Sequence, residues 1–175
     1  MSSARRLGRT TALAVAAATV MATLLAPSSP ASAAYTPPLR DGSSSLLAAA
    51  SCWGIKQSVP AAVDGIYWLQ TSKLVAPEQF YCDMTTDGGG WVLVGRGRDN
   101  WTWSQNGQGT PGQIRTTPSG TGAFAPAALP SATIDGLLDG ARVDSLSDGI
   151  RVRRTTNATG TTAQEMRLKT SITGP

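Results

Sequence analysis

The chain has 175 residues, with 15 Lys and Arg, 11 Asp and Glu, no histidine and a formal net charge of +4. No apolar stretch reaches the roughly 20 residues that a membrane-spanning helix needs. The lack of histidine removes the side chain most often used for proton transfer near neutral pH. Composition therefore argues against an integral membrane protein and gives no support to catalysis.

Residues 1–33 are expected to be a secretion signal. Three arginines precede an uncharged apolar stretch at 11–26, and Ala31-Ser32-Ala33 offers a cleavage site. The Arg5-Arg6 pair leaves open whether export follows the general or the twin-arginine route. The mature protein is expected to be secreted and extracellular, with no membrane insertion after the signal is removed.

Removal of the signal changes the charge argument. Three of the fifteen basic residues lie in it, so twelve remain against eleven acidic residues, a net charge of about +1. In the basic run Arg151, Arg153 and Arg154, the first two arginines alternate with Ile150 and Val152, a period typical of a half-buried strand. We expect a solvated strand face rather than a phosphate-binding patch, and no nucleic-acid partner.

The first predicted elements follow a polar segment. Residues 34–48 are rich in Pro, Gly and Ser and are expected to form a flexible linker. A short helix is expected to begin in residues 46–52, with Ser45 as its N-cap. Strands are expected at residues 65–70, 79–84 and 91–96, because these runs are rich in β-branched and aromatic residues.

The segment between the second and third expected strands predicts a hairpin. Asp87-Gly88 is a strong turn signal, and the neighbouring glycines tolerate positive φ. A run of three glycines also lets the backbone of another segment approach closely, and Trp91 is then expected to return to the core. A phosphate-binding glycine loop would open a helix, whereas a strand is expected here.

The rest of the chain completes a mixed pattern. Residues 97–130 are expected to be a long exposed loop. Ser131 is expected to cap a short helix that ends near Gly140. Residues 149–156 and 163–170 are expected to form two further strands joined by a turn. The predicted fold class is α+β with mainly antiparallel pairing.

The chain contains two cysteines, Cys52 and Cys82. They are expected to pair, because an exported protein meets an oxidising environment. The alternatives, a catalytic thiol or a metal ligand, lack any histidine or further soft ligand in the sequence. The bridge would close a loop of about 31 residues, which removes unfolded-chain entropy equivalent to roughly 3 to 4 kcal/mol.

A family resemblance starts from the sequence around the second cysteine. Tyr81-Cys82-Asp83, followed after four residues by Gly88-Gly89-Gly90-Trp91, resembles the opening of a fibrinogen C-terminal-like domain, particularly the secreted bacterial versions. Gly65-Ile66-Tyr67 extends the resemblance, which covers residues 50–96. It implies that Cys52 and Cys82 form the first disulfide of that fold, and that the hairpin links a small N-terminal subdomain to the central sheet.

The resemblance thins beyond Arg96. The animal members continue with Q-R-R, where this chain has Gly95-Arg96-Gly97-Arg98, and their F-W-L-G segment has no counterpart. Family members carry a calcium site, a second disulfide and an acetyl-group or glycan pocket in their C-terminal portion. Residues 49–175 are therefore expected to be the N-terminal portion of such a domain, incomplete, with no cofactor and none of the family's binding residues carried over.

Acidic residues are the first candidates for chemistry. Asp135, Asp139, Asp144 and Asp148 lack the alternate-position spacing of a calcium-binding loop, and three of them precede glycines as in turns, so no metal is expected. A carboxylate-pair hydrolase would have to use Asp83 and Asp87, which are better explained by the geometry of the turn. No catalytic residue is assigned, and the protein is not expected to be an enzyme.

Trp101 and Trp103 are the candidate ligand-binding residues. Residues i and i+2 of an extended segment point to the same face, and two exposed indoles could stack against sugar rings. The alternative is that one or both indoles pack against the sheet. The expected function is a secreted fibrinogen-like recognition module that binds carbohydrate or a surface ligand. A structural or truncated module without a ligand, and a secreted hydrolase, are the alternatives.

Overall fold

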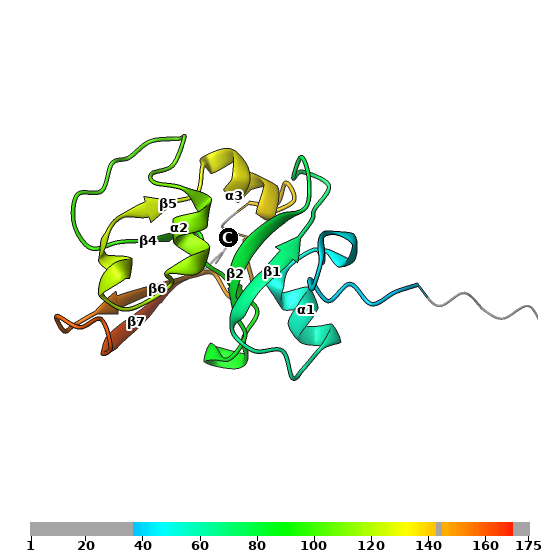
Figure 1. Ribbon diagram of the computed structural model, residues 1–175, viewed down its shortest axis with the longest axis horizontal. Helices are drawn as coiled ribbons and strands as arrows, with labels where there is room; N and C mark the ends of the chain where they lie inside the picture. The colour runs from blue at the N-terminus through cyan, green and yellow to red at the C-terminus, as the bar shows by residue number, and fades with distance from the viewer. Residues whose placement is uncertain (1–36, 143–144, 170–175) are drawn as a thin grey trace, which may run out of the picture. The chain divides into compact units, whose positions relative to one another are not determined.

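The computed structural model describes residues 37–142 and 145–169, so the expected signal at 1–33 lies outside the described residues. The described residues form a mixed α+β structure with three small sheets, of strand order β1-β2-β3, β4-β5 and β6-β7 (Figure 1). All pairs of neighbouring strands are antiparallel. The predicted α+β class with antiparallel pairing is confirmed.

The helices and strands are short. The helical elements are the 3₁₀-helices η1 (Ser45–Leu47), η2 (Thr86–Gly88) and η3 (Thr121–Phe124) and the α-helices α1 (Cys52–Ser58), α2 (Pro111–Thr116) and α3 (Ser131–Leu137). The strands are β1 (Gly65–Leu69), β2 (Glu78–Asp83), β3 (Trp91–Val92), β4 (Gly95–Arg96), β5 (Ala127–Ala128), β6 (Ile150–Thr155) and β7 (Ala163–Leu168). With 19 glycines and 11 prolines in the chain, frequent turns are expected.

The segment before β1 packs more closely than its composition suggests. Gly42 is buried at a φ of +72°, and a Cβ at this position would lie 2.7 Å from Cδ1 of Ile55. The N–H of Trp68 donates to the carbonyl of Gly42 at 2.8 Å, and the N–H of Gly42 donates to Leu47 at 2.9 Å. Residues from Gly42 onward therefore belong to the fold, although they lie in the range expected as a linker.

The first α-helix begins later than the sequence predicted. Ser44, rather than Ser45, caps the 3₁₀-helix η1, and Ser51 caps α1, its Oγ accepting a backbone N–H at 2.9 Å. Ala49 lies between the two helices and forms a β-bridge with Leu69. That bridge requires extended backbone at Ala49, which a helix running from residue 46 to 52 would not allow.

Strands β1 and β2 form the predicted antiparallel pair, and β3 adds to the other side of β2. The register runs from Gly65↔Cys82 to Leu69↔Glu78, and Asp83 faces Trp91. The third predicted strand at 91–96 is divided between two sheets, because β3 pairs with β2 whereas β4 pairs with β5. A continuous apolar run in the sequence does not show that its two halves face different partners.

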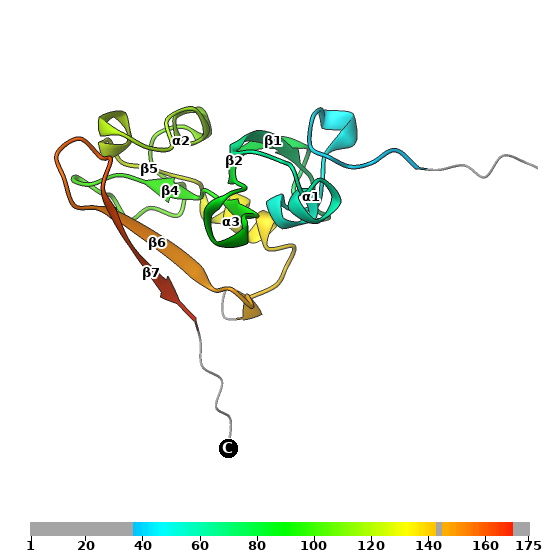
Figure 2. The same ribbon diagram turned by 90° about the horizontal axis from the view of Figure 1, so that it is seen from below.

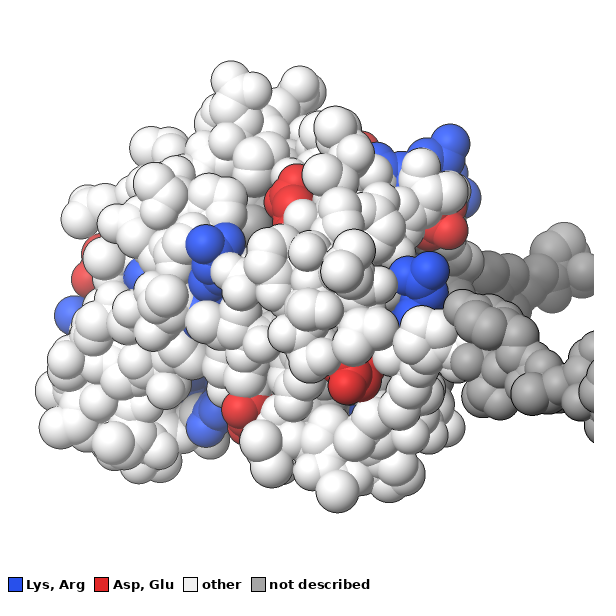
Figure 3. All heavy atoms as spheres, turned by 45° about the vertical axis from the view of Figure 1, so that its right-hand side comes forward, with Lys and Arg blue, Asp and Glu red and all other residues white. Residues whose placement is uncertain are grey.

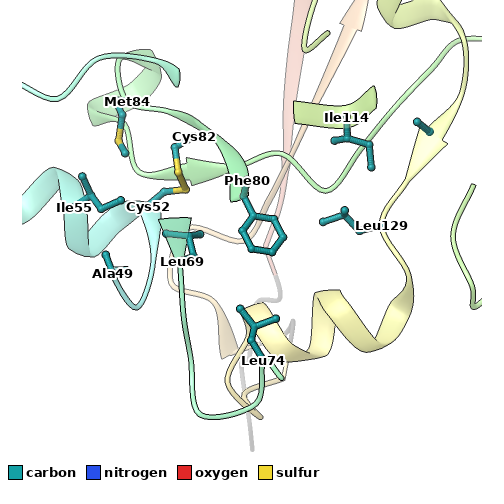
Figure 4. Close-up of a cluster of buried hydrophobic side chains, with 11 residues drawn as sticks. Ala49, Cys52, Ile55, Leu69, Leu74, Phe80, Cys82, Met84, Ile114 and Leu129 are labelled. Atoms are coloured by element: carbon teal, nitrogen blue, oxygen red, sulfur yellow. A yellow bond between two sulfur atoms is a disulfide. The ribbon is translucent and has the colours of Figure 1, made fainter. Parts of the chain in front are cut away.

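The Cys52–Cys82 disulfide is present and lies in the centre of the core. Its Cα atoms are 5.6 Å apart, and it ties α1 to β2 (Figure 4). The buried core cluster consists of Ala49, Cys52, Ile55, Leu69, Leu74, Phe80, Cys82, Met84, Ile114, Ala127 and Leu129. The predicted pairing is confirmed, and the bridge is fully enclosed by apolar side chains.

The range 97–130, expected to be a loop, contains α2, η3 and β5. Helix α2 starts with a capping box, in which Thr110 Oγ1 accepts the Gln113 N–H at 3.3 Å and Gln113 Oε1 accepts the Thr110 N–H at 2.8 Å. Pro111 occupies the first turn, and Ile114 reaches the core. The T-x-x-Q spacing with Pro111 was a readable helix signal that the surrounding Gly and Ser obscured.

Helix α3 matches the predicted position with a different cap. Pro130, rather than Ser131, is the N-cap, and the Ser131 hydroxyl donates to the carbonyl of Gln105 at 3.2 Å. The helix ends at Leu137, and Asp139 follows it with a φ of +53°. The helix is thus present, but it ends at Leu137, before the predicted end near Gly140.

Strands β6 and β7 are confirmed, but Arg151 is mostly buried where a solvated position was predicted, whereas Arg153 on the same face is exposed. The pair runs from Ile150↔Leu168 to Thr155↔Ala163 and forms a ribbon of its own (Figure 2). Ile150 and Val152 are 40% and 38% exposed, whereas the side chain of Arg151 is 12% exposed. Arg151 therefore does not belong to a solvated face, because it finds an ionic partner in the body of the domain.

Candidate functional site

The two candidate indoles differ in exposure. Trp103 is 96% exposed, whereas Trp101 is half-buried. The Trp101 ring lies over the backbone at Gly97, where an added Cβ would come within 3.0 Å of Cζ2. Trp101 is therefore a packed residue at the base of the loop, and Trp103 alone presents a free aromatic face.

The loop that carries Trp103, residues 98–110, is fixed by the side chain of Gln108. Its Oε1 accepts the N–H of Thr102 at 2.8 Å, and its Nε2 donates to the carbonyl of Asn100 at 3.0 Å. The backbone of Gln108 in turn exchanges hydrogen bonds of 3.0 and 2.8 Å with Ala128 of β5. Trp103 is thus presented on a preorganised loop, which reduces the entropy cost of binding.

Charged side chains begin the same loop. The Arg98 guanidinium lies 4.3 Å from the ring centroid of Phe124 and pairs with Asp99 at 3.1 Å. Both charged side chains are more than half exposed. An exposed indole with hydrogen-bonding groups in the same loop can recognise a sugar, because sugars offer apolar C–H faces and hydroxyl rims.

The glycine run of the Tyr81–Trp91 motif has a structural role at each position. Gly88, Gly89 and Gly90 have φ values of +86°, +78° and +87°. A Cβ at Gly89 would lie 2.1 Å from the carbonyl oxygen of Met84, and one at Gly90 would lie 2.7 Å from Cε3 of Trp53 in α1. The predicted close approach of another segment is confirmed at Gly90.

The same motif receives the β6–β7 ribbon. Arg151 pairs with Asp83, and Arg167 pairs with Asp87. Both guanidinium groups lie over the Trp91 ring, at 4.8 and 5.1 Å from its centroid. These five residues, Asp83, Asp87, Trp91, Arg151 and Arg167, are called the clamp below. The prediction that Trp91 returns to the core is wrong, because this half-buried residue lies outside the core cluster and packs against the ribbon arginines.

Asp83 is the electrostatic centre of the clamp. Burial alone would raise the pKa of this carboxyl, but the N–H of Thr86, the Arg151 guanidinium and the N–H of Thr85 outweigh it and hold its pKa below the ordinary value. The N–H groups of Thr86 and Thr85 donate to Oδ1 at 2.9 and 3.1 Å. Burial, assisted by the charges of Asp64 and Asp83, raises the pKa of the neighbouring Tyr81. Asp83 is therefore a fixed anion.

This arrangement bears on the hydrolase alternative. A general acid must carry a proton near neutral pH, which enzymes achieve by raising the pKa of a carboxyl. Asp83 shows the opposite shift, and both Asp83 and Asp87 are engaged by arginines. The geometry suits anchoring better than proton transfer.

Two residues of the acidic series, Asp139 and Asp148, have separate partners from distant parts of the chain. Asp139 accepts a hydrogen bond from Ser72 Oγ at 2.7 Å, and Asp148 lies 3.7 Å from Lys169. Asp144 lies outside the described residues. In residues 37–142 and 145–169, no group of three or more His, Cys, Asp or Glu side chains could hold a metal ion.

The distribution of surface charge does not indicate a binding site. On the face drawn in Figure 3, basic and acidic side chains are scattered singly among uncharged residues. In the described part of the chain, no helix has the length and apolar character needed to cross a membrane.

No protein-family model matches the chain. The likeness to fibrinogen-like domains therefore depends on the motif residues and the disulfide position.

Proposed function

We propose that the protein is a secreted, non-enzymatic recognition module of the fibrinogen-like type that binds a carbohydrate or another surface ligand through Trp103. The observation that carries the proposal is the 96% exposure of this indole on a hydrogen-bonded loop. An indole offers a rigid apolar face with a polar N–H, which suits it to stacking against a sugar ring, and the hydrogen-bonded loop holds it in place.

The fibrinogen-like part of the proposal has its own support. Tyr81-Cys82-Asp83 and the following Gly88-Gly89-Gly90-Trp91 stand in the order that such domains use. The Cys52–Cys82 disulfide joins the same two segments that the resemblance implies. The clamp also gives Asp83 and Trp91 a structural role in receiving a distant ribbon.

A binding screen tests the proposal. The purified protein is applied to a panel of immobilised glycans, and any saturable binding is compared between wild type, Trp103→Ala and Trp103→Phe. Loss of binding in the alanine variant with partial retention in the phenylalanine variant supports stacking on the ring. Val75→Ala is the matched control, because Val75 is fully exposed and lies far from Trp103 in sequence.

The screen also has a result that rejects the proposal. Saturable binding that Trp103→Ala leaves unchanged would place the ligand elsewhere, and no binding to any glycan or cell surface would leave the module without a ligand. The second outcome favours the structural alternative. That alternative has an observation of its own, because the outer face of the β6–β7 ribbon exposes Ile150, Val152, Met166 and Leu168.

A further inference from the structure

The β6–β7 ribbon stands apart from the hydrophobic core. Among the described residues, the core cluster and the side chains packed against it come from positions 49 to 137, and none comes from β6 or β7. The apolar side chains of the ribbon point outward, with exposures from 38% at Val152 to 56% at Leu168. The ribbon is therefore attached to the domain without the burial of its apolar residues.

Its attachment is concentrated in the clamp. Two ion pairs and two cation–π contacts join Arg151 and Arg167 to the Tyr81–Trp91 motif. At the far end, Gly160 approaches the backbone of Gly120, where an added Cβ would lie 2.9 Å from the carbonyl carbon. The Arg151–Asp83 ion pair depends on the charge of the carboxylate, so it weakens when Asp83 is neutralised, whereas the cation–π contacts depend on the arginines and the Trp91 ring.

The ribbon also depends on the clamp for its own stability. Arg151 and Arg167 are direct cross-strand partners, and like charges in that position repel. An isolated two-stranded hairpin is at best marginally stable in water. Asp83 and Asp87 neutralise the two arginines, so a docked ribbon is stable where a free one is not.

The docked state also carries a cost. Nη1 of Arg151 is buried and has no hydrogen-bond partner within the described part of the chain. Release of the ribbon would return this donor to water, which recovers its hydration. The docked and released states are therefore closer in free energy than the number of clamp contacts suggests.

We propose that the β6–β7 ribbon is a releasable arm, which the clamp holds on the Tyr81–Trp91 motif at neutral pH and which neutralisation of Asp83 frees while the disulfide-bonded core stays folded. The charged and titratable groups around the two carboxyls are Arg151 and Arg167 in the clamp and Asp64, Tyr81, Arg153 and Glu165 beside it.

The sign of the pH effect follows from the contacts of Asp83. Its pKa in the folded protein is lowered, so its stabilising contribution is complete above the unfolded value near 4 and is lost as the pH falls through the folded value. Asp64 adds negative charge nearby, and its Oδ1 accepts the N–H of Met84 at 2.7 Å. Arg153 pairs with Glu165 at 3.7 Å, so this arginine adds little to the docking of Asp83.

Hydrogen–deuterium exchange on the full chain tests the arm. Peptides from β6–β7 and from β1–β2 are compared at pH 7 and near pH 2, below the lowered folded pKa of Asp83, with exchange corrected for its intrinsic pH dependence. At the lower pH, β6–β7 is expected to lose at least about tenfold of its protection while β1–β2 keeps its own. Asp83→Asn is expected to produce the same selective loss at pH 7.

Asp99→Asn serves as the control, because Asp99 is exposed and pairs with its neighbour Arg98. This variant is expected to leave both regions unchanged at pH 7. The proposal is overturned if β6–β7 and β1–β2 lose protection together, which would mean one cooperative unit, or if β6–β7 stays protected near pH 2. A clamp variant that fails to fold would lose β1–β2 protection and count as the first of these results.

Discussion

Arg151 on β6 donates a hydrogen bond to Asp83 at the end of β2, across 68 residues of sequence, and both side chains are only 12% exposed. This contact joins the β6–β7 ribbon, near the C-terminal end of the described chain, to an aspartate of the Tyr81–Trp91 motif. The aspartate next to Cys82 is therefore an anchor for a distant element as well as a turn residue.

The pH dependence of stability should carry the signature of Asp83. Because its folded pKa is lowered, wild-type protein is expected to lose unfolding free energy as the pH falls below about 4, whereas Asp83→Asn loses less over the same range. At pH 7 the variant is expected to lose ribbon docking rather than core stability, so its unfolding free energy falls by much less than the roughly 3 kcal/mol typical of a broken buried ion pair, because Arg151 returns to water. Urea denaturation at several pH values measures both effects, and parallel curves for the two proteins would contradict the assignment.

The disulfide should contribute strongly to stability. It closes a loop with a sequence separation of 30 residues, and its removal is expected to lower the unfolding free energy by about 3 to 4 kcal/mol. Thermal melts of the oxidised and reduced protein measure the difference, with intact mass confirming the two states. Equal melting temperatures would show that the bridge adds nothing beyond the core packing.

Two glycines of the motif should respond differently to alanine. Gly88 and Gly90 both have positive φ, but an added Cβ meets nothing within 4 Å at Gly88, whereas at Gly90 it lies 2.7 Å from the Trp53 ring and 2.9 Å from its Cα. Gly88→Ala is expected to cost about 1 kcal/mol, from backbone strain alone. Gly90→Ala is expected to cost about 2 to 4 kcal/mol, because α1 must move. Chemical denaturation of the pair tests this order, and equal losses would contradict it.

The two tryptophans of the 98–110 loop should separate stability from binding. Trp103→Ala is expected to change the unfolding free energy by less than about 0.5 kcal/mol, because an exposed side chain makes few contacts. Trp101→Ala is expected to cost about 1 to 2 kcal/mol, since its ring covers Gly97. Thermal denaturation distinguishes the two, and a large loss for Trp103→Ala would mean that the indole is packed in solution.

Local signals predicted much of this fold from the sequence. Runs of β-branched and aromatic residues located β1 and β2, and the turn signal at Asp87-Gly88 located the hairpin between β2 and β3. The disulfide followed from the number of cysteines and the expected compartment. Each of these features depends on residues close in sequence or on the chemistry of a single residue type.

The rest depended on contacts between distant segments. The alternation in β6 shows that Ile150 and Arg151 point to opposite faces, but it does not show which face meets the domain. That choice is made by Asp83 and Trp91, which no local pattern connects to β6. The unequal exposure of Trp101 and Trp103 likewise depends on Gly97 and Gln108.

The most direct test of the proposed recognition role is a ligand titration followed through the indole N–H resonances of ¹⁵N-labelled protein. The glycan that binds in the screen is added stepwise, and the resonance of each of the five tryptophans is assigned by single substitution. The proposal predicts a saturable shift of the Trp103 resonance, with that of Trp91 unchanged in the clamp. A saturable shift at another indole without one at Trp103, or no shift at any indole, would contradict binding through Trp103.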